Sequence, residues 1–73
     1  MDPATLEATL KADISEMRDR LDEAAGIAKA ASACAETGNI SKAIEIALDV
    51  EQLIYEANTF MNAASLMHRI SKS

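Results

Sequence analysis

The strongest constraint on this chain is the uneven distribution of large apolar residues between its two halves. Residues 40–70 contain 13 of them, whereas residues 2–36 contain six. Those in the second half are Ile40, Ile44, Ile46, Leu48, Val50, Leu53, Ile54, Tyr55, Phe60, Met61, Leu66, Met67 and Ile70. Those in the first half are Leu6, Leu10, Ile14, Met17, Leu21 and Ile27. If both halves are helices, the first cannot cover the second, and the remaining apolar surface requires a partner.

Length and composition indicate one small helical domain. At 73 residues, the chain is near the size at which a single core is marginal without disulfides, metal or oligomerisation. Two Gly and one Pro leave few helix breaks, and the abundant alanine favours helix. The only aromatic residues are Tyr55 and Phe60, so the core volume must come from aliphatic side chains and close helix approach.

Residues 3–36 are predicted to form the first helix. Asp2 is a favoured N-cap, and Pro3 suits the first helical position because its missing N–H has no intrahelical partner there. Apolar residues then recur at alternating spacings of four and three, which are the a and d positions of a heptad repeat. They are Leu10, Ile14, Met17, Leu21, Ala24, Ala28, Ala31 and Ala35. The change to alanine after Leu21 indicates a closer helix approach toward the turn.

Residues 37–39, Thr-Gly-Asn, form the one strong break in the helical pattern. Gly38 supplies the left-handed residue that ends a helix, and Asn39 or Ser41 can cap the next one. Residues 36–45 resemble the turn inside a tetratricopeptide hairpin, where Gly and a small polar residue precede a similar Lys-Ala-Ile-Glu run. The likeness covers about 20 residues, and both helices are too long for a repeat of about 34 residues. We therefore interpret it as shared turn chemistry.

Residues 40–71 are predicted to form a second helix of matching length. Its a and d positions are Ile40, Ala43, Ala47, Val50, Ile54, Ala57, Met61, Ala64 and His68. Beside them runs a second apolar stripe at seven-residue spacing, the g positions Ile46, Leu53, Phe60 and Met67. The a and d positions are expected to close an antiparallel hairpin on the first helix. The g stripe then remains exposed and is our predicted dimer interface.

The sequence therefore predicts an all-α fold, a long antiparallel two-helix hairpin that dimerises into a four-helix bundle. A two-fold axis lets the same surface bury itself, and each large side chain left exposed forgoes ~1.5–3 kcal/mol. A different protein that offers an apolar groove is the alternative to a second copy. The sequence leaves open how the two hairpins are oriented.

The charge balance argues against nucleic acid and membranes as partners. The formal net charge is −5, from 12 acidic and 7 basic residues, whereas phosphate binding needs clustered Lys and Arg. No run approaches the ~20 apolar residues of a membrane span, and no secretory signal pattern is visible. A single cysteine, Cys34, cannot form an internal disulfide and fits a reducing compartment. We expect a cytoplasmic protein.

No residue pattern points to chemistry. His68 has no Cys or carboxylate close in sequence with which to bind a metal. Cys34 lies among alanines, so we interpret it as a small apolar core residue, with no base placed to activate it. Catalytic triads, Gly-rich phosphate loops and paired catalytic carboxylates are equally missing from the sequence. We expect no enzymatic activity, cofactor or metal.

The outward side of the second helix is the candidate surface for a protein partner. No Lys or Arg lies between Lys42 and Arg69, so this side is predicted to be acidic. The proposed partner-binding residues are Leu48, Tyr55, Leu66, Glu45, Asp49 and Glu56. Exposed apolar residues bordered by carboxylates are typical of protein-binding surfaces. The simpler interpretation of the acidic residues is a solvated helix face.

These features predict a non-enzymatic regulator, inhibitor or adaptor that acts through protein–protein binding as a homodimer. One alternative is a small acidic chaperone for a secreted or self-assembling helical client, which would keep its apolar stripe for that client. A further alternative is a phage-type or antitoxin-type inhibitor, which the acidic face permits. An unidentified protein partner is compatible with all three hypotheses.

Overall fold

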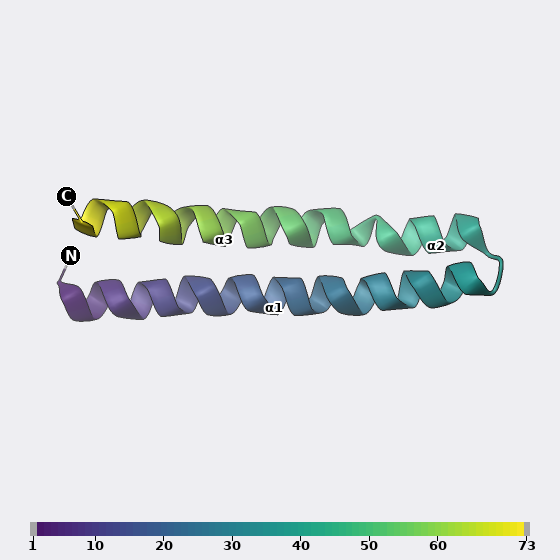
Figure 1. Ribbon diagram of the computed structural model, residues 1–73, viewed down its shortest axis with the longest axis horizontal. Helices are drawn as coiled ribbons and strands as arrows, with labels where there is room; N and C mark the ends of the chain where they lie inside the picture. Colours follow the sequence, from purple (N-terminus) through teal and green to yellow (C-terminus); the bar gives the residue numbers. More distant parts are fainter. Residues whose placement is uncertain (1, 73) are drawn as a thin grey trace.

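In a computed structural model the chain forms two long antiparallel arms joined by a tight turn (Figure 1). The structure describes residues 2–72. Helix α1 spans Pro3–Glu36, and the returning arm consists of α2, Ile40–Ala47, and α3, Asp49–Lys72. These residues include no strand, and the Cα atoms extend over 54 × 15 × 12 Å. The predicted all-α hairpin is confirmed.

Local side-chain chemistry determines where the helices begin and end. The Asp2 carboxylate accepts hydrogen bonds from the Thr5 backbone N–H at 3.0 Å and the Thr5 hydroxyl at 2.7 Å. Gly38 adopts a left-handed conformation with φ of 92°, which glycine tolerates best. The side chain of Asn39 then accepts a hydrogen bond from the Lys42 N–H at 3.1 Å and caps α2.

The second arm is not the single helix that the sequence predicts, because it is interrupted at Leu48. The Leu48 N–H still bonds to the Ile44 carbonyl at 3.0 Å, but the Glu51 N–H bonds to the Leu48 carbonyl at 3.2 Å. A bond across three residues is the tighter, 3₁₀ type of turn. Leu48 keeps helical dihedral angles, φ −60° and ψ −28°, so α3 continues nearly in line with α2 (Figure 1).

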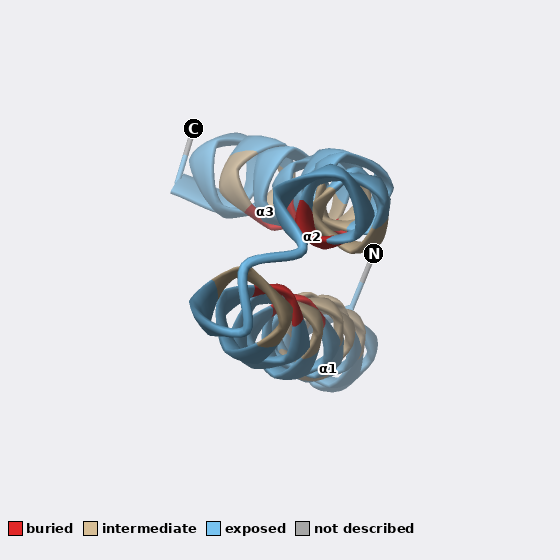
Figure 2. Ribbon diagram, turned by 90° about the vertical axis from the view of Figure 1, so that its right-hand side faces the viewer, coloured by how far each residue is buried: buried red, intermediate tan, exposed pale blue. Residues whose placement is uncertain are grey.

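The contact between the arms consists mostly of alanine. In the end-on view the buried side of each arm faces the other, and most of the remaining surface is exposed (Figure 2). The buried apolar residues are Ala24, Ala31, Ala43, Leu53, Ala57 and Ala64. Leu53 is the one large side chain among them, so the hairpin alone encloses a thin core.

The arms meet along the small residues of the predicted a and d stripes and leave several of their large residues open. Five alanines of the expected stripes are buried: Ala24, Ala31, Ala43, Ala57 and Ala64. Four large residues of the same stripes lie on one side of the contact and remain about half exposed. Their exposed fractions are 53% for Ile14, 42% for Leu21, 46% for Ile54 and 46% for Met61. The prediction that these four close the hairpin is wrong.

The residues of the g stripe pack between the arms in place of these four. Leu53 is buried, and Ile46, Phe60 and Met67 are half-buried, whereas the heptad pattern predicts all four on the outer surface of the hairpin. On α1 the matching half-buried stripe contains Arg20 and Ile27. The apolar side of the second arm is wider than one helix can cover, so one of its edges must stay open. The hairpin covers the g edge.

Candidate protein-binding face

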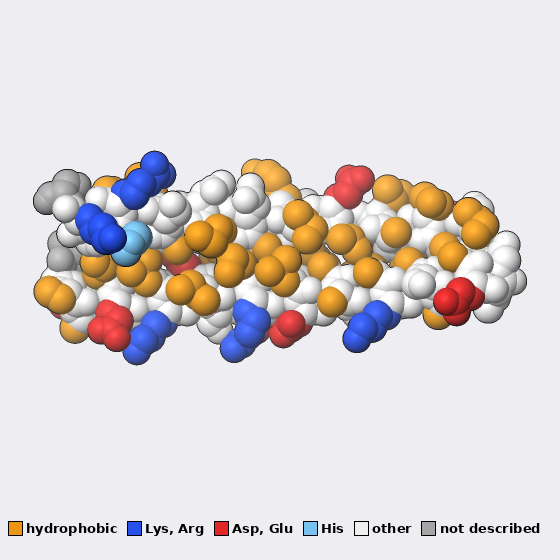
Figure 3. All heavy atoms as spheres, in the orientation of Figure 1, with side chains coloured by type: hydrophobic (Ala, Val, Ile, Leu, Met, Phe, Trp, Pro, Cys, Tyr) orange, Lys and Arg blue, Asp and Glu red, His pale blue; other side chains and the backbone are white. Residues whose placement is uncertain are grey.

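One long face of the hairpin is apolar and open to solvent. We call it the groove face. Figure 3 shows apolar side chains continuing along the line between the arms, with charged side chains at its margins. Its large residues are Leu10, Ile14, Met17 and Leu21 of α1 and Ile40, Ile54 and Met61 of the second arm. These residues come from the very stripes that the sequence predicts to be internal.

Two hollows open on the groove face, in the half that carries the chain ends. The larger has a volume of about 390 Å³ and is lined by Leu10, Ile14, Met17, Met61, Ala64, Ser65 and His68. The smaller has a volume of about 230 Å³ and is lined by Met17, Leu21, Ile54, Ala57, Asn58 and Met61. Their walls come from both arms and are largely aliphatic, which suits apolar side chains from a partner rather than a charged ligand.

The opposite side of the hairpin is closed by a polar cluster around Arg20, which we call the Arg20 cluster. Arg20 Nε donates to Glu56 Oε1 at 3.0 Å, and Arg20 Nη1 donates to Glu16 Oε2 at 2.9 Å. The guanidinium also lies 5.5 Å from the ring centroid of Phe60, within cation–π range. Gln52 Nε2 donates to the second oxygen of Glu56 at 3.1 Å. Because Arg20 belongs to α1 while Glu56 and Phe60 belong to α3, these contacts fix the rotation of each arm about its own axis.

The Arg20 cluster shifts the pKa values of both Arg20 and Glu56. The hydrogen bond to Glu56 is the main factor that raises the pKa of Arg20. Hydrogen bonds from Gln52 and then Arg20 lower the pKa of Glu56. Both shifts favour the charged forms, as expected for an ion pair with further hydrogen bonds.

Sequence reasoning missed the Arg20 cluster because it counts a charged residue as outward-facing. The one available signal is spacing, since Arg20 lies seven residues before Ile27 and seven after Asp13. A long arginine side chain can cover apolar surface while its charged end stays near water.

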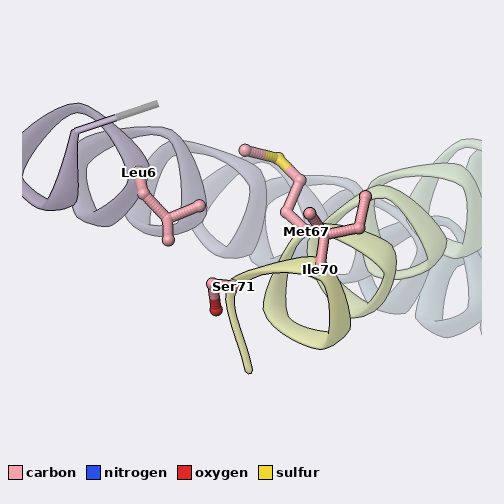
Figure 4. A pocket seen from close by; sticks show the side chains of 4 residues that line it. All are labelled: Leu6, Met67, Ile70 and Ser71. Atoms are coloured by element: carbon pink, nitrogen blue, oxygen red, sulfur yellow. The ribbon is translucent and has the colours of Figure 1, made fainter. Parts of the chain in front are cut away.

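A further hollow of about 300 Å³ lies at the open end of the hairpin. Leu6 of α1 and Met67, Ile70 and Ser71 of α3 line it (Figure 4). Met67, a predicted dimer-interface residue, therefore lies between the arms, and the hollow shows that the end of the hairpin is loosely filled.

The predicted partner-binding surface is only partly assembled as expected. Leu48, Tyr55 and Leu66 are exposed on the second arm, as are Glu45 and Asp49. Glu56 is different, because its carboxylate turns toward α1 and is held by Arg20. Placing Glu56 in the outward acidic line is therefore wrong, and the line is shorter than predicted.

His68 and Cys34 lie in different parts of the hairpin. His68 is exposed and lines the larger hollow of the groove face. Cys34 is half-buried, and its Sγ lies 3.6 Å from the Asn39 carbonyl oxygen, to which the thiol donates a weak hydrogen bond. The contact joins the end of α1 to the start of α2, which is a structural role at the turn.

Residues 2–72 contain no group of three His, Cys, Asp or Glu side chains arranged to hold a metal ion. Within the same residues, none of the helices combines the length and apolar character needed to cross a membrane. Searches against protein-family models, curated proteins and solved structures give no match.

Proposed function

We propose that this protein is a non-enzymatic interaction module that self-associates through the groove face, so that two hairpins form a four-helix bundle. The observation that carries the proposal is the exposure of four large side chains along one face, Ile14, Leu21, Ile54 and Met61. Completing the burial of each contributes about 1 kcal/mol, since full burial of such a side chain contributes ~1.5–3 kcal/mol.

The size of the groove face suits a second copy. In the plane of the face the Cα atoms span 54 Å by 15 Å, so a second hairpin of the same length can lie along the whole face. Because one face packs on an identical face, the association closes at two copies. The interface would be apolar at its centre and charged at its rim, the usual arrangement in protein complexes.

The thin core of the single hairpin also favours association. A chain of this size seldom obtains enough stability from one small core, and here the arms bury alanines and a single leucine. Packing groove face against groove face adds a second, larger apolar layer to the same domain. Folding and association would then be coupled, and stability would rise with protein concentration.

In the resulting bundle the outward side of the second arm stays available for another protein. Leu48, Tyr55 and Leu66 lie there beside Glu45 and Asp49, so a partner with complementary basic residues would be recognised. By binding another protein through this side, the dimer would act as an adaptor or inhibitor.

Measuring the mass in solution tests the proposal. Sedimentation equilibrium at low micromolar concentration should give twice the chain mass of 7.8 kDa. A folded monomer would contradict self-association and favour the chaperone hypothesis, in which the open groove receives a client helix. If the protein is a chaperone, its melting temperature should rise when an apolar amphipathic helical peptide is added. If it is a self-associated dimer, the peptide should leave the melting temperature unchanged.

A further inference from the structure

A third stripe of residues runs along the second arm, on the side turned away from α1. Its members lie four and three residues apart in alternation, the spacing of a and d positions in a heptad repeat. We call it the outer stripe, and it contains Leu48, Gln52, Tyr55, Thr59, Asn62 and Leu66. All six residues are exposed, and the exposed fractions are 56% for Leu48, 69% for Tyr55 and 52% for Leu66. The stripe has the spacing of a helix-pairing seam.

The position of the outer stripe follows from the residues that face α1. Leu53, Ala57 and Ala64 are buried in the contact between the arms. At ~100° per residue, Tyr55 lies about 200° around the helix from Leu53 and about 100° from Ile54 of the groove face. In the end-on view this side of the second arm is exposed (Figure 2). A second copy packed on the groove face therefore leaves the outer stripe open.

Carboxylates border the outer stripe at its turn end. Asp49 and Glu51 occupy the flanking e and g positions, and both are exposed. Neither belongs to an ion pair within residues 2–72. In paired helices, charges at these positions determine which partner is accepted. Packing two outer stripes together would leave these carboxylates without a cation, because the second arm has no Lys or Arg between Lys42 and Arg69.

We infer, on the basis of the proposed function, that the outer stripe binds an amphipathic helix of another protein. That helix would present aliphatic side chains along its own a and d positions and Lys or Arg at the flanking e and g positions. Two helices paired in this way cross at a shallow angle and stay in contact over several turns. From Leu48 to Leu66 the stripe is ~27 Å long at 1.5 Å per residue, which is enough for such a contact.

The centre of the contact would be Tyr55. Leu48, one heptad before it, supplies a second apolar anchor. The exposed tyrosine ring offers its face to a guanidinium. Glu51 precedes Tyr55 by four residues and is its neighbour on the helix surface, so its carboxylate can bond to the same guanidinium. An arginine of the partner helix beside Tyr55 would therefore be held by both residues.

The polar members of the stripe can be covered at low cost. The Thr59 hydroxyl donates to the Tyr55 carbonyl oxygen at 3.0 Å, and the Gln52 amide nitrogen donates to Glu56 at 3.1 Å. These donors keep their acceptors when a helix covers them, and a donor that stays paired avoids the penalty of burial. Polar residues in a seam also lower affinity and fix register, which suits a reversible complex aligned by Asn62.

Peptide binding to the full-length protein tests the inference. The probe is a fluorescein-labelled peptide of about three heptads with Leu at a and d and Arg at e and g, and its counterpart carries Glu at e and g. By fluorescence anisotropy the basic peptide should bind at least about tenfold more tightly, and more weakly as salt rises. The apolar peptide that tests the chaperone hypothesis lacks basic residues and should not bind here. Equal affinity for the two labelled peptides, or no binding, would overturn the inference.

Truncations locate the bound peptide. Tyr55→Ala and Leu48→Ala remove exposed side chains and should each raise the dissociation constant at least about fivefold, as expected for interface anchors. Ile54→Ala, on the groove face, is the control and should leave the constant unchanged. A constant that responds to Ile54→Ala and not to Tyr55→Ala would place the peptide on the groove face and overturn the inference.

Charge reversal separates a specific contact from general attraction. Glu51→Lys should weaken binding of the basic peptide at least about fivefold and strengthen binding of the acidic one. Glu23→Lys makes the same change in net charge at an exposed position of α1 and should change either constant less than about twofold. Equal effects of the two variants would overturn the inference.

The solution mass keeps the two proposals apart. A monomeric mass with peptide binding that depends on Tyr55 would contradict self-association and support the outer stripe. A dimeric mass with binding that ignores Tyr55 would overturn the outer stripe alone.

Discussion

The guanidinium of Arg20 on α1 holds the carboxylate of Glu56 on α3, with Nε 3.0 Å from Oε1, on the side of the hairpin opposite the groove face. The same guanidinium covers the ring of Phe60. One edge of the contact between the arms is thus closed by charged and aromatic side chains. The other edge, the groove face, is lined mostly by aliphatic side chains, with Asn58, Ser65 and His68 among them.

We predict that the hairpin loses stability in acid as Glu56 becomes protonated. Hydrogen bonds from Gln52 and Arg20 lower the pKa of Glu56 in the folded chain, whereas an unfolded Glu has a pKa of about 4.3. The Glu56 contribution is therefore fully present above about pH 4.3 and is lost as the pH falls through the lower folded-state value. The free energy of unfolding, measured by urea titration from about pH 7 to pH 3, should decline below that point.

The variant Glu56→Gln isolates this contribution. It should lower the free energy of unfolding at neutral pH and make the decline in acid shallower. Glu45→Gln removes the same charge from an exposed position outside the Arg20 cluster and should keep the decline. An acid profile of Glu56→Gln that matches the unchanged protein would show that the cluster contributes nothing to stability.

Leu53→Ala should be among the most destabilising apolar truncations. Among residues 2–72, Leu53 is the one large buried side chain, and replacing a buried leucine with alanine costs 2–5 kcal/mol. We expect about 2–3 kcal/mol, at the lower end of that range, because a single helix packs against it. Leu66→Ala, on an exposed leucine, should cost less than about 0.5 kcal/mol. Both are measured by urea unfolding at one protein concentration, and equal costs would refute the rotation of the arms described above.

The two glycines should respond in opposite directions to alanine. Gly26 lies inside α1 and Gly38 has φ of 92°, and a Cβ added at either meets no atom within 4 Å. Gly26→Ala should raise the free energy of unfolding by about 1 kcal/mol, since helical glycine is that much less favourable than alanine. Gly38→Ala should lower it by about 1–2 kcal/mol, the cost of a left-handed residue with a side chain. Thermal unfolding followed by circular dichroism measures both, and stabilisation by Gly38→Ala would contradict the turn geometry.

Local rules were sufficient to predict the helical hairpin. Asp2 and Asn39 cap their helices, and Gly38 adopts the left-handed conformation, as their residue types indicate. Each of these features depends only on residues a few positions apart along the chain, so it can be predicted from a short stretch of sequence. The break at Leu48 has no Gly or Pro to announce it, and no local rule predicts it.

The choice between adjacent apolar stripes could not be predicted in the same way. Ile54 and Leu53 recur with the same seven-residue period, so periodicity alone ranks them equally. What separates them is a tertiary contact, since Arg20 reaches across to Glu56 and Phe60 on the Leu53 side. The sequence predicts the g stripe as the open face of the hairpin, whereas in the structure the open face is the stripe that contains Ile54 and Met61.

The most direct test of the account is the solution mass of two matched variants. Ile54 and Leu66 are aliphatic residues of α3 with similar exposure, but only Ile54 lies on the groove face. Sedimentation equilibrium at low micromolar concentration should give a dimer for the unchanged protein and for Leu66→Asp, and a monomer for Ile54→Asp. A dimeric Ile54→Asp, or an unchanged protein that is already a folded monomer, would contradict self-association through the groove face.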